Sequence, residues 1–501
     1  MSKKLYYWDN LDVLSTHIDD DSIDLIYLDP PFNSNRDYNA NFSKSAGEND
    51  TAQMMAFEDS WSRNQQSEEM LNYMRSDDMI AYMPVSKMLD MFVEMLDRND
   101  TAAYLTMMTP RLCLMHGKLK DTWSIYLHCD PTASHYVKII MDKIFGKRNF
   151  RNEIVRSYRT GWSSTNFWSK KHDVILFYSI SDKYFFNNQK EKSYTKSKSR
   201  KPWIVNYWKW DAEFFEDDKG VYNIVNARDV REIPYINSQS KERLWYPTQK
   251  PIALLERILK ASCPVDGVVL DPFCGCGTTL AAAESLNKSS EYHISRIGID
   301  LTPLAINVIE KRLEEVYGLQ SGKDFTVVGD PVDYAGAIKL AKEVDKYHFE
   351  NWVMRLLNCI PSKYKVVGWK VVPLKWWDGG FDGFARFGIK DGDNKWLMIA
   401  EVKSGKVGRR DIDIFVQAMT RQWADIGVFV VLEKANMAKD GYAEASKQWF
   451  YDYKWFQIPK IQIWNIEDHF SGKKPLLPFG MAGHIIGKKT SGSTKEEETL
   501  F

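Results

Sequence analysis

The stretch VVLDPFCGCGTTLAAA, residues 268 to 283, has the pattern of a short apolar strand, a glycine-rich loop and the beginning of a helix. Gly275 and Gly277 would let backbone N–H groups approach a ligand where that helix begins. The next apolar segment, RIGIDL, carries Asp300 near its end, where an acid that holds ribose hydroxyls would lie. This pattern predicts an α/β sheet with a nucleotide-like cofactor at its edge, although a glycine loop alone is also typical of a structural tight turn.

A second apolar segment, SIDLIYL, runs directly into DPPF at residues 29 to 32. Proline cannot donate to a sheet and restricts the residue before it, so the prolines should end a strand and leave a stiff backbone. Ligands of open α/β sheets bind at the carboxyl ends of strands, which would place Asp29 and Phe32 beside a pocket. A DPP sequence alone is equally typical of a plain strand-terminating turn, so other parts of the chain must decide.

The composition is that of a folded protein. A chain of 501 residues with 44% hydrophobic and 14% aromatic content can build sizeable cores, in about two to four domains. The longest apolar runs, such as residues 428 to 432, are too short to span a bilayer, and MSKKLYYWDN reaches Asp9 before a signal-peptide core could form. We therefore expect a cytoplasmic protein. Six cysteines without paired CxxC spacing favour reduced thiols over disulfides or a zinc site.

Positive charge is concentrated in one region. Lys+Arg and Asp+Glu are equal at 67 each, so a nucleic-acid footprint has to be local. Basic and aromatic residues are interleaved between residues 148 and 203: Arg148, Arg151, Arg156, Arg159, Lys170, Lys171, Lys190, Lys192, Lys196, Lys198, Arg200 and Lys201, with Tyr158, Trp162, Phe167, Trp168, Tyr194 and Trp203. This mixture suits phosphate contacts combined with stacking or groove readout, and a solvated charged face is the alternative.

Apolar strands alternate with helical patterns from residue 1 to about 150, which predicts a parallel sheet with crossover helices. Between 150 and 245 the pattern loosens and resembles an insertion, and the α/β alternation then resumes up to about residue 317. A connection follows, and another α/β unit begins near Tyr347. The last residues have the composition of a disordered tail.

DPPF and FCGCG together resemble the motifs of DNA amino-methyltransferases, which use S-adenosylmethionine. DPPF precedes the basic insert and the insert precedes the glycine loop, an order similar to the permuted beta class of that family. The resemblance covers about residues 5 to 320, including WDNLDVL and YPTQKPIALLERI. It implies catalytic roles for Asp29, Pro30, Pro31 and Phe32, and cofactor binding by Asp9, Thr248, Gln249, Lys250, Pro251, Asp271, Phe273, Gly275, Gly277, Thr278 and Asp300.

The chemistry of amino methylation accounts for these residue types. An exocyclic adenine nitrogen is a poor nucleophile because its lone pair is delocalised into the ring. Asp29 and the Pro30 carbonyl could each accept one N–H and favour the pyramidal form in which that pair is free. Phe32 would stack on the base after it leaves the duplex. Asp rather than Ser at position 29 resembles adenine-N6 enzymes more than cytosine-N4 enzymes, and the insert would read the DNA sequence.

A second set of charged residues lies in DGGFDGFARFGIKDGDNKWLMIAEVK, residues 378 to 403. Strand alternation puts Glu401 and Lys403 on one face. With Asp382 they could hold Mg²⁺ and activate a water, although for the tripeptide alone a surface salt bridge is the alternative. Together with FENWVMRLL and VQAMTRQWADIGVFVVL, the segment resembles Mrr-like nucleases of the PD-(D/E)xK restriction-endonuclease fold over about residues 345 to 470. This implies Glu350, Asp382, Glu401 and Lys403 as catalytic residues and Asp382 and Glu401 as Mg²⁺ ligands.

The prediction is therefore an α/β protein of restriction-modification or phage-defence type that acts on double-stranded DNA. A Rossmann-like methyltransferase core in two halves, 1–150 and 246–320, would hold a target-recognition insert at 151–245, followed by a connector at 321–345, a nuclease domain at 346–480 and a disordered tail at 481–501. Two alternatives stay open: a nuclease that needs modified DNA or partner proteins, and a silent DNA-binding module. A homodimer is plausible. His128 is expected to be a satisfied residue at a strand end.

Overall fold

The structure is a computed structural model. It describes residues 3–31, 65–131, 133–158, 164–169, 171–194, 213–237, 239–244, 246, 248–289, 291–331, 333–344, 346–357, 359–361, 364–367, 370–373, 380–387, 396–448, 450–453 and 456–476. Two predicted features lie outside these residues: Phe32 and the tail at 481–501. So do several of the predicted DNA contacts, namely Arg159, Trp162, Lys170, Lys196, Lys198, Arg200, Lys201 and Trp203.

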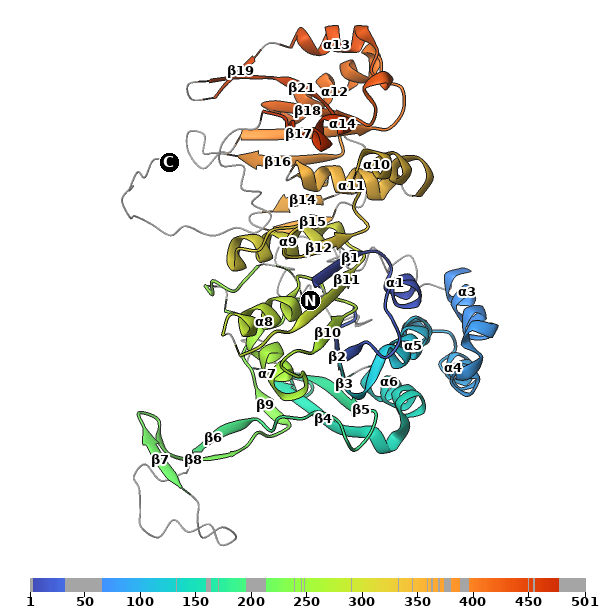
Figure 1. The fold of residues 1–501 in the computed structure, drawn as a ribbon, viewed down its shortest axis with the longest axis vertical. Coiled ribbons are helices and arrows are strands. Elements are labelled where there is room, and N and C mark those ends of the chain that lie inside the picture. The colour runs from blue at the N-terminus through green and yellow to red at the C-terminus, as the bar shows by residue number, and fades with distance from the viewer. Residues whose placement is uncertain are drawn as a thin grey trace.

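A nine-stranded mixed sheet forms the larger unit, in the order β12-β1-β11-β10-β2-β3-β5-β4-β9 (Figure 1). Its strands are β1 (Lys3–Tyr7), β2 (Ile23–Leu28), β3 (Leu119–Cys129), β4 (Phe150–Ser157), β5 (His172–Ser179), β9 (Val230–Glu232), β10 (Val268–Asp271), β11 (Ser295–Asp300) and β12 (Thr326–Val328). The strands from β12 to β3 are parallel to their neighbours, whereas β5 runs antiparallel to β3 and β4. The parallel sheet predicted for residues 1 to about 150 is confirmed, because β1, β2 and β3 run parallel to one another in this sheet. The antiparallel strands β4 and β5 belong to the segment predicted as an insert, and they are joined without a crossover helix.

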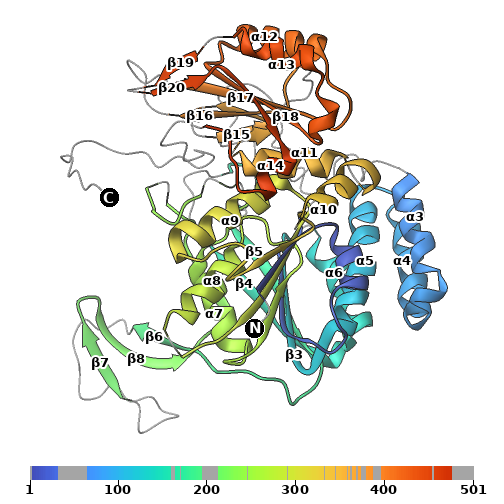
Figure 2. The ribbon, with the colours of Figure 1, turned by 45° about the horizontal axis from the view of Figure 1, so that its top comes forward.

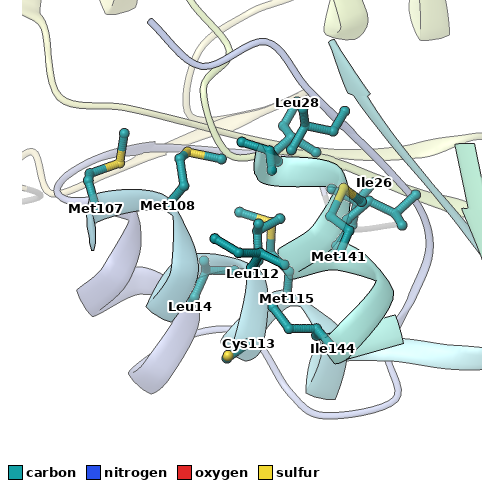
Figure 3. Close-up of a cluster of buried hydrophobic side chains, with 14 of the residues drawn as sticks. Leu14, Ile26, Leu28, Met107, Met108, Leu112, Cys113, Met115, Met141 and Ile144 are labelled. Carbon is teal, nitrogen blue, oxygen red and sulfur yellow. The ribbon is translucent and has the colours of Figure 1, made fainter. Parts of the chain in front are cut away.

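Helices cover both faces of this sheet (Figure 2). One face carries α1 (Asn10–Thr16), α5 (Asp100–Lys118) and α6 (Ser134–Met141), with α3 (Gln65–Met74), η2 (Asp77–Tyr82) and α4 (Met83–Met95) outside them; the other carries α7 (Ile252–Ser262), α8 (Thr278–Asn287) and α9 (Pro303–Tyr317). Strand β2 is buried throughout and alternates between the two faces. Ile26 and Leu28 pack with Leu112 of α5 and Met141 (Figure 3), whereas Tyr27 belongs to the core beneath α7 and α8.

Two sequence expectations can be checked directly on these elements. All six cysteines are buried free thiols, as predicted. None of the described helices combines the length and the apolar content needed to cross a bilayer.

The predicted insert is divided between the core sheet and a projecting arm. Strands β4, β5 and β9 belong to the nine-stranded sheet, while β6 (Lys190–Tyr194), β7 (Phe214–Asp217) and β8 (Gly220–Asn226) form a separate three-stranded antiparallel sheet that extends away from it (Figure 1). Arg156 and Tyr158 were expected among the DNA contacts, but both side chains are buried, so that expectation is wrong for them. Phe167 and Trp168 are exposed at 57% and 96% and stay candidates for DNA contact.

The smaller unit is a second α/β structure, built on its own sheet. Its five-stranded sheet has the order β13 (Ile360–Pro361), β16 (Gly383–Phe387), β17 (Trp396–Lys403), β18 (Ile426–Val431), β21 (Ile461–Asn465). The other elements are α10 (Tyr334–Lys339), η5 (Leu340–Val344), α11 (Lys346–Leu356), α12 (Arg409–Gln422), α13 (Lys439–Ser446) and α14 (Ile466–Phe470), with hairpins β14 (Tyr364–Val367)–β15 (Lys370–Pro373) and β19 (Phe450–Tyr453)–β20 (Phe456–Pro459). The expected connector contains β12, which pairs with β1, and α10, which packs in the smaller unit's core.

Helix α11 joins the two units through a buried cluster of charges. The guanidinium of Arg355 lies 3.3 Å from Glu310 of α9, is also paired with Asp330, and sits over the ring of Tyr7. Burial raises the pKa of Glu310 to about 7 and also raises the pKa of Asp330, because a carboxylate is poorly solvated there. The Arg355 guanidinium thus offsets two largely buried carboxylates.

We expect Arg355→Leu to lower the free energy of unfolding by about 3–5 kcal/mol, because Glu310 and Asp330 would lose their buried cation. Chemical denaturation would measure it. Lys342→Leu is the matched control: Lys342 pairs with Glu433 at 2.7 Å but is 45% exposed, so its loss should cost about 1 kcal/mol or less. Equal losses in the two variants would contradict the role given to Arg355.

Candidate active site

Four carboxylates lie where four neighbouring parallel strands end. Asp9 follows β1, Asp300 ends β11, Asp271 ends β10 and Asp29 follows β2, in the spatial order β1-β11-β10-β2. Because the carboxyl ends of parallel strands meet at one edge, the motifs around residues 9, 29, 271 and 300 converge there although they are far apart in the sequence.

Asp29 is largely buried and its two oxygens have different surroundings. Oδ2 accepts a charged hydrogen bond from the ammonium of Lys250, whose Nζ also lies 3.4 Å from the Thr248 carbonyl. Oδ1 is buried and has no hydrogen-bond partner among the described residues. Lys250 was predicted to contact a cofactor, and the structure places it on the Asp29 carboxylate.

A buried histidine lies behind Asp29. The Nδ1 atom of His128 is 2.9 Å from the Tyr27 hydroxyl and 3.9 Å from Asp29 Oδ1, and its Nε2 atom is 3.3 Å from Asp173 Oδ2. Burial lowers the pKa of His128. Although burial alone would raise the pKa of Asp173, its interactions with His128, Lys250 and Arg156 bring that pKa below its usual value. The ring of His128 therefore has polar partners, as expected, but they belong to the surroundings of Asp29.

The glycine loop between β10 and α8 is held by the strand-end acids. Asp300 accepts hydrogen bonds from the Gly275 N–H (2.8 Å) and from the backbone N–H and hydroxyl of Thr302 (2.8 and 2.7 Å). Asp271 accepts hydrogen bonds from the Thr279 hydroxyl (2.5 Å) and the Phe273 N–H (3.2 Å). Burial raises the pKa of Asp271 to about 7 and that of Asp300 to about 6.

Two hollows adjoin this loop. The first is lined by Trp8, Asp9, Pro31, Phe273 and Asp300, among others. The second is lined by residues that include Tyr27, Asp29, Thr248, Lys250, Asp271, Gly275 and Thr278. Phe273 lines both, so one elongated molecule could extend from Asp300 past the glycine loop to Asp29.

Three other predicted cofactor residues have structural contacts. The side-chain amide of Gln249 accepts from the Leu244 N–H and donates to the Glu242 carbonyl, both at 2.7 Å, which fixes the loop before α7. Pro251 is the N-cap residue of α7. Gly277 has φ +69° and is the N-cap residue of α8.

Arg111 and Asn10, which the sequence did not single out, fix the position of residues that line the first hollow. Arg111 of α5 donates from Nη2 to both oxygens of Asp9, at 3.0 and 3.2 Å, and from Nε to the Asn10 amide oxygen at 2.5 Å. Asn10 in turn donates to the Pro272 carbonyl at 2.8 Å. These contacts join segments about 100 and 260 residues apart in the chain, and no local pattern indicates them.

Gly277→Ala should destabilise the glycine loop because a Cβ there would lie 2.7 Å from Ile309 Cγ1, in addition to the cost of a positive φ. We expect an overpacking loss of about 1–3 kcal/mol in the free energy of unfolding. Gly318→Ala is the control: its φ is +71° but nothing lies within 4 Å of its Cβ, so it should show the backbone cost alone. Denaturation curves of the two variants separate the contributions, and equal losses would contradict the steric argument.

The second predicted set of residues gathers in the smaller unit. Asp382 accepts a hydrogen bond from the Val402 N–H at 2.7 Å, and the ammonium of Lys403 lies 2.6 Å from Glu401. Burial raises the pKa of Glu401 to about 7, and the nearby charges of Asp382 and Glu350 add to the shift. Glu350 of α11 is thus near enough for its charge to act on Glu401, and Glu401 Oε2 is buried without a hydrogen-bond partner among the described residues.

The metal prediction needs a qualification. Within the part of the chain that the structure describes, no three His, Cys, Asp or Glu side chains form a group that could hold a metal ion. Asp382 and Glu401 thus offer two carboxylates rather than a complete cage. Mg²⁺ is commonly held by one or two carboxylates together with water and substrate phosphate, so this donor set fits that ion.

The fold and this edge of the sheet define an α/β protein with adjoining pockets at the ends of its parallel strands. The chain belongs to the DNA methylase family, because the family model N6_N4_Mtase, described as DNA methylase, matches residues 23–311.

Individual relatives match parts of the chain. Type II methyltransferase M.EcaI of Enterobacter cloacae is 27% identical over 268 residues, which cover 42% of this chain and 57% of the relative. DNA adenine methyltransferase YhdJ of Escherichia coli is 27% identical over 205 residues, 40% of this chain and 63% of the relative. The structure of the M1.HpyAVI–SAM complex covers 62% of this chain and 98% of its own, at 15% identity and a TM-score of 0.32.

Proposed function

We propose that the larger unit is a site-specific DNA adenine-N6 methyltransferase that uses S-adenosylmethionine. The observation that carries the proposal is Asp29, which follows β2 and lines the same hollow as the glycine loop, with a buried oxygen that has no partner among the described residues. Membership of the DNA methylase family supports DNA as the substrate. The Asp at position 29 and the similarity to the DNA adenine methyltransferase YhdJ support adenine.

The residues of the two hollows suit S-adenosylmethionine, which would supply an activated methyl group. Trp8, Pro31 and Phe273 offer apolar surface for an adenine ring, and Asp300 next to them offers oxygens for ribose hydroxyls. Asp271 and the glycine loop would hold the part nearer Asp29. Asp9 is fixed by Arg111 and thus could contribute to the first hollow without moving.

The chain's own part in the reaction is to orient the amino group of the target base. Asp29 Oδ1 would accept one N–H and the Pro30 carbonyl the other, so that the nitrogen lone pair points away from both acceptors. The two prolines keep these acceptors in place, since their backbone cannot relax. Phe32 would stack on the flipped base.

We place target recognition in residues 151–245, and more narrowly in the arm of β6, β7 and β8 with the exposed aromatic residues Phe167 and Trp168. Strands β4 and β5 would anchor that region, because they are part of the core sheet. Duplex DNA would then lie across the carboxyl edge of the sheet, next to Asp29.

We also propose that the smaller unit, within residues 346–480, is a Mg²⁺-dependent DNA endonuclease of the Mrr-like type. Three observations on Glu401 support this: Lys403 pairs with it, the charges of Asp382 and Glu350 help to raise its pKa, and one of its oxygens is buried without a hydrogen-bond partner among the described residues. Asp382 and Glu401 would hold Mg²⁺, and Lys403 would orient the attacking water. Nucleases of this fold commonly cut duplexes in pairs, so a homodimer is part of the proposal.

Both activities on one chain suggest restriction and modification at a shared site. The test is to incubate the protein with Mg²⁺, S-adenosylmethionine and unmethylated DNA of diverse sequence, and to map N6-methyladenine and break ends by sequencing. Breaks near the motif that carries methyl groups are expected. Equal cutting of fully methylated and unmethylated sites would contradict the coupling, and an absence of N6-methyladenine would contradict the methyltransferase.

Methylation without any breaks would point to a different role for the smaller unit. The remaining readings are a DNA-binding module without cleavage activity and a nuclease that needs modified DNA or a defence-system partner. Weakened DNA binding after removal of residues 345–501 would favour the module. Cleavage that is restored by methylated substrate DNA would favour the modification-dependent nuclease.

A further inference from the structure

Asp29 has only one oxygen available to a substrate proton. Its Oδ2 atom is paired directly with the Lys250 ammonium, and both side chains are only 13% exposed. Its Oδ1 atom is buried without a hydrogen-bond partner among the described residues. A proton that arrives on this carboxylate must therefore bind Oδ1, and it needs a further acceptor before the next turnover.

His128 is a buried base that lies beside Asp29 Oδ1. Its Nδ1 atom is 3.9 Å away, a separation that can shorten when substrate is bound, since catalytic hydrogen bonds are often long in the free enzyme. The Tyr27 hydroxyl, 2.9 Å from the same nitrogen, can donate to it or rotate to accept from it. The Nε2 atom faces Asp173, so the neutral ring can carry its one N–H proton on Nε2. The lone pair of Nδ1 can then accept a proton.

Asp173 is held as the ionised carboxylate, which is the form that would stabilise a protonated His128 ring. Arg156 lies 3.3 Å from its Oδ2 atom, and the Tyr158 hydroxyl donates to Oδ1 at 3.0 Å. The charged and titratable groups that face His128 are thus Tyr27 and Asp29 from β2 and its end, Asp173 from β5, Arg156 from β4 and Lys250 from the loop before α7. Of these groups, Lys250 and Arg156 are cations that cannot accept a proton.

We propose that His128, supported by Asp173, receives the proton that the target amino nitrogen loses, by way of Asp29. The inference rests on the proposed methyltransferase function. As the N6–methyl bond forms, the sulfur–methyl bond breaks and its electron pair stays on sulfur. The N6–H bond breaks with its electron pair left on nitrogen, and the proton passes from Asp29 Oδ1 to His128 Nδ1. The imidazolium pairs with Asp173 until product leaves and the proton returns to water. His128 acts through Asp29 and is thus a positioning residue.

The test compares His128→Asn with the wild-type chain. Asparagine can keep a hydrogen bond in this place but cannot take up a proton at neutral pH. The single-turnover rate of methyl transfer to duplex DNA should fall by about 10²-fold or more, while S-adenosylmethionine affinity by calorimetry and DNA affinity by anisotropy stay within about 3-fold. In the wild type the rate of methyl transfer should decline as the pH is lowered and His128 becomes protonated. This decline should begin at a pH below the ordinary pKa of histidine, because burial lowers the pKa of His128. That decline should disappear in the variant.

His116→Asn is the matched control. His116 of α5 also contacts a tyrosine through Nδ1, at 3.1 Å from the Tyr82 hydroxyl, and it packs against Trp123 in the core on the α5 face of the sheet. This variant removes a similar contact far from Asp29. Histidine NMR of the free protein gives a readout independent of activity, and His128 should carry its proton on Nε2.

Several results would overturn the inference while the proposed function stands. They are a His128→Asn rate within about 3-fold of wild type, a loss matched by His116→Asn or by weaker binding, an unchanged pH profile, or a ring protonated on Nδ1. A wild-type protein that transfers no methyl group to adenine would instead contradict the proposed function itself.

Discussion

Asp29→Ala should lower the single-turnover rate of adenine methylation by about 10²–10³-fold, because the acceptor that orients the amino group would be lost. Affinity for S-adenosylmethionine should change little, since the first hollow is lined by Trp8, Asp9 and Asp300 and does not include Asp29. Rapid-quench assays with radiolabelled methyl donor would measure the rate, and calorimetry the affinity. The expected result is a defect in chemistry with intact cofactor binding.

Two control variants make this prediction specific. Asp29→Asn retains an acceptor oxygen, so it should keep more activity than the alanine variant. Asp121→Ala removes an exposed aspartate from β3 and should keep the wild-type rate. Because Asp29→Ala also leaves the Lys250 ammonium without its buried partner, thermal melting must accompany the assay. A folded Asp29→Ala protein that methylates at the wild-type rate would contradict the role of Asp29.

The sequence predicted those parts of the site that lie at the ends of strong local patterns. Apolar runs followed by proline or glycine end strands for steric reasons, so β2, β10 and β11 and the acids Asp29, Asp271 and Asp300 could be placed at one edge of the sheet. The short strand β1 and its neighbour β12 at the edge of the sheet were not recognised. With five and three residues they carry too little pattern, and they depend on pairing with each other and with β11.

Contacts between distant segments could not be predicted in this way. Arg156 has the same sequence signature as a surface DNA contact, yet its neighbours in β4 and β5 bury it against Asp173. Lys250 fits a cofactor motif, and only the fold shows that its ammonium reaches Asp29. In each case the partner carboxylate decides the role of the cation. Asp173 is 17 residues from Arg156 in the sequence, and Asp29 is 221 residues from Lys250.

Helix α11 shows how the two units can be adjacent and still have separable chemistry. Residues seven apart on a helix share a face, and those two apart lie on opposite sides. Accordingly, His348 and Arg355 contact Tyr7 in the larger unit, while the charge of Glu350 acts on Glu401 in the smaller unit. Lys403 pairs with Glu401 and is half-exposed at the end of β17, so its replacement leaves the contacts of His348 and Arg355 untouched.

If the smaller unit is the nuclease proposed above, Lys403→Ala should therefore slow DNA cleavage strongly and leave adenine methylation at the wild-type rate. If Lys403 orients the attacking water, its loss should reduce the cleavage rate by about 10²-fold or more. The reduction should persist at saturating Mg²⁺, because Asp382 and Glu401 would still hold the ion. Lys406→Ala, an exposed lysine three residues further along, is the matched control for loss of one positive charge near DNA. If the wild type cuts DNA and both variants cut equally well, Lys403 contributes only general charge, whereas a joint loss of cutting and methylation would show that the two units depend on each other for folding.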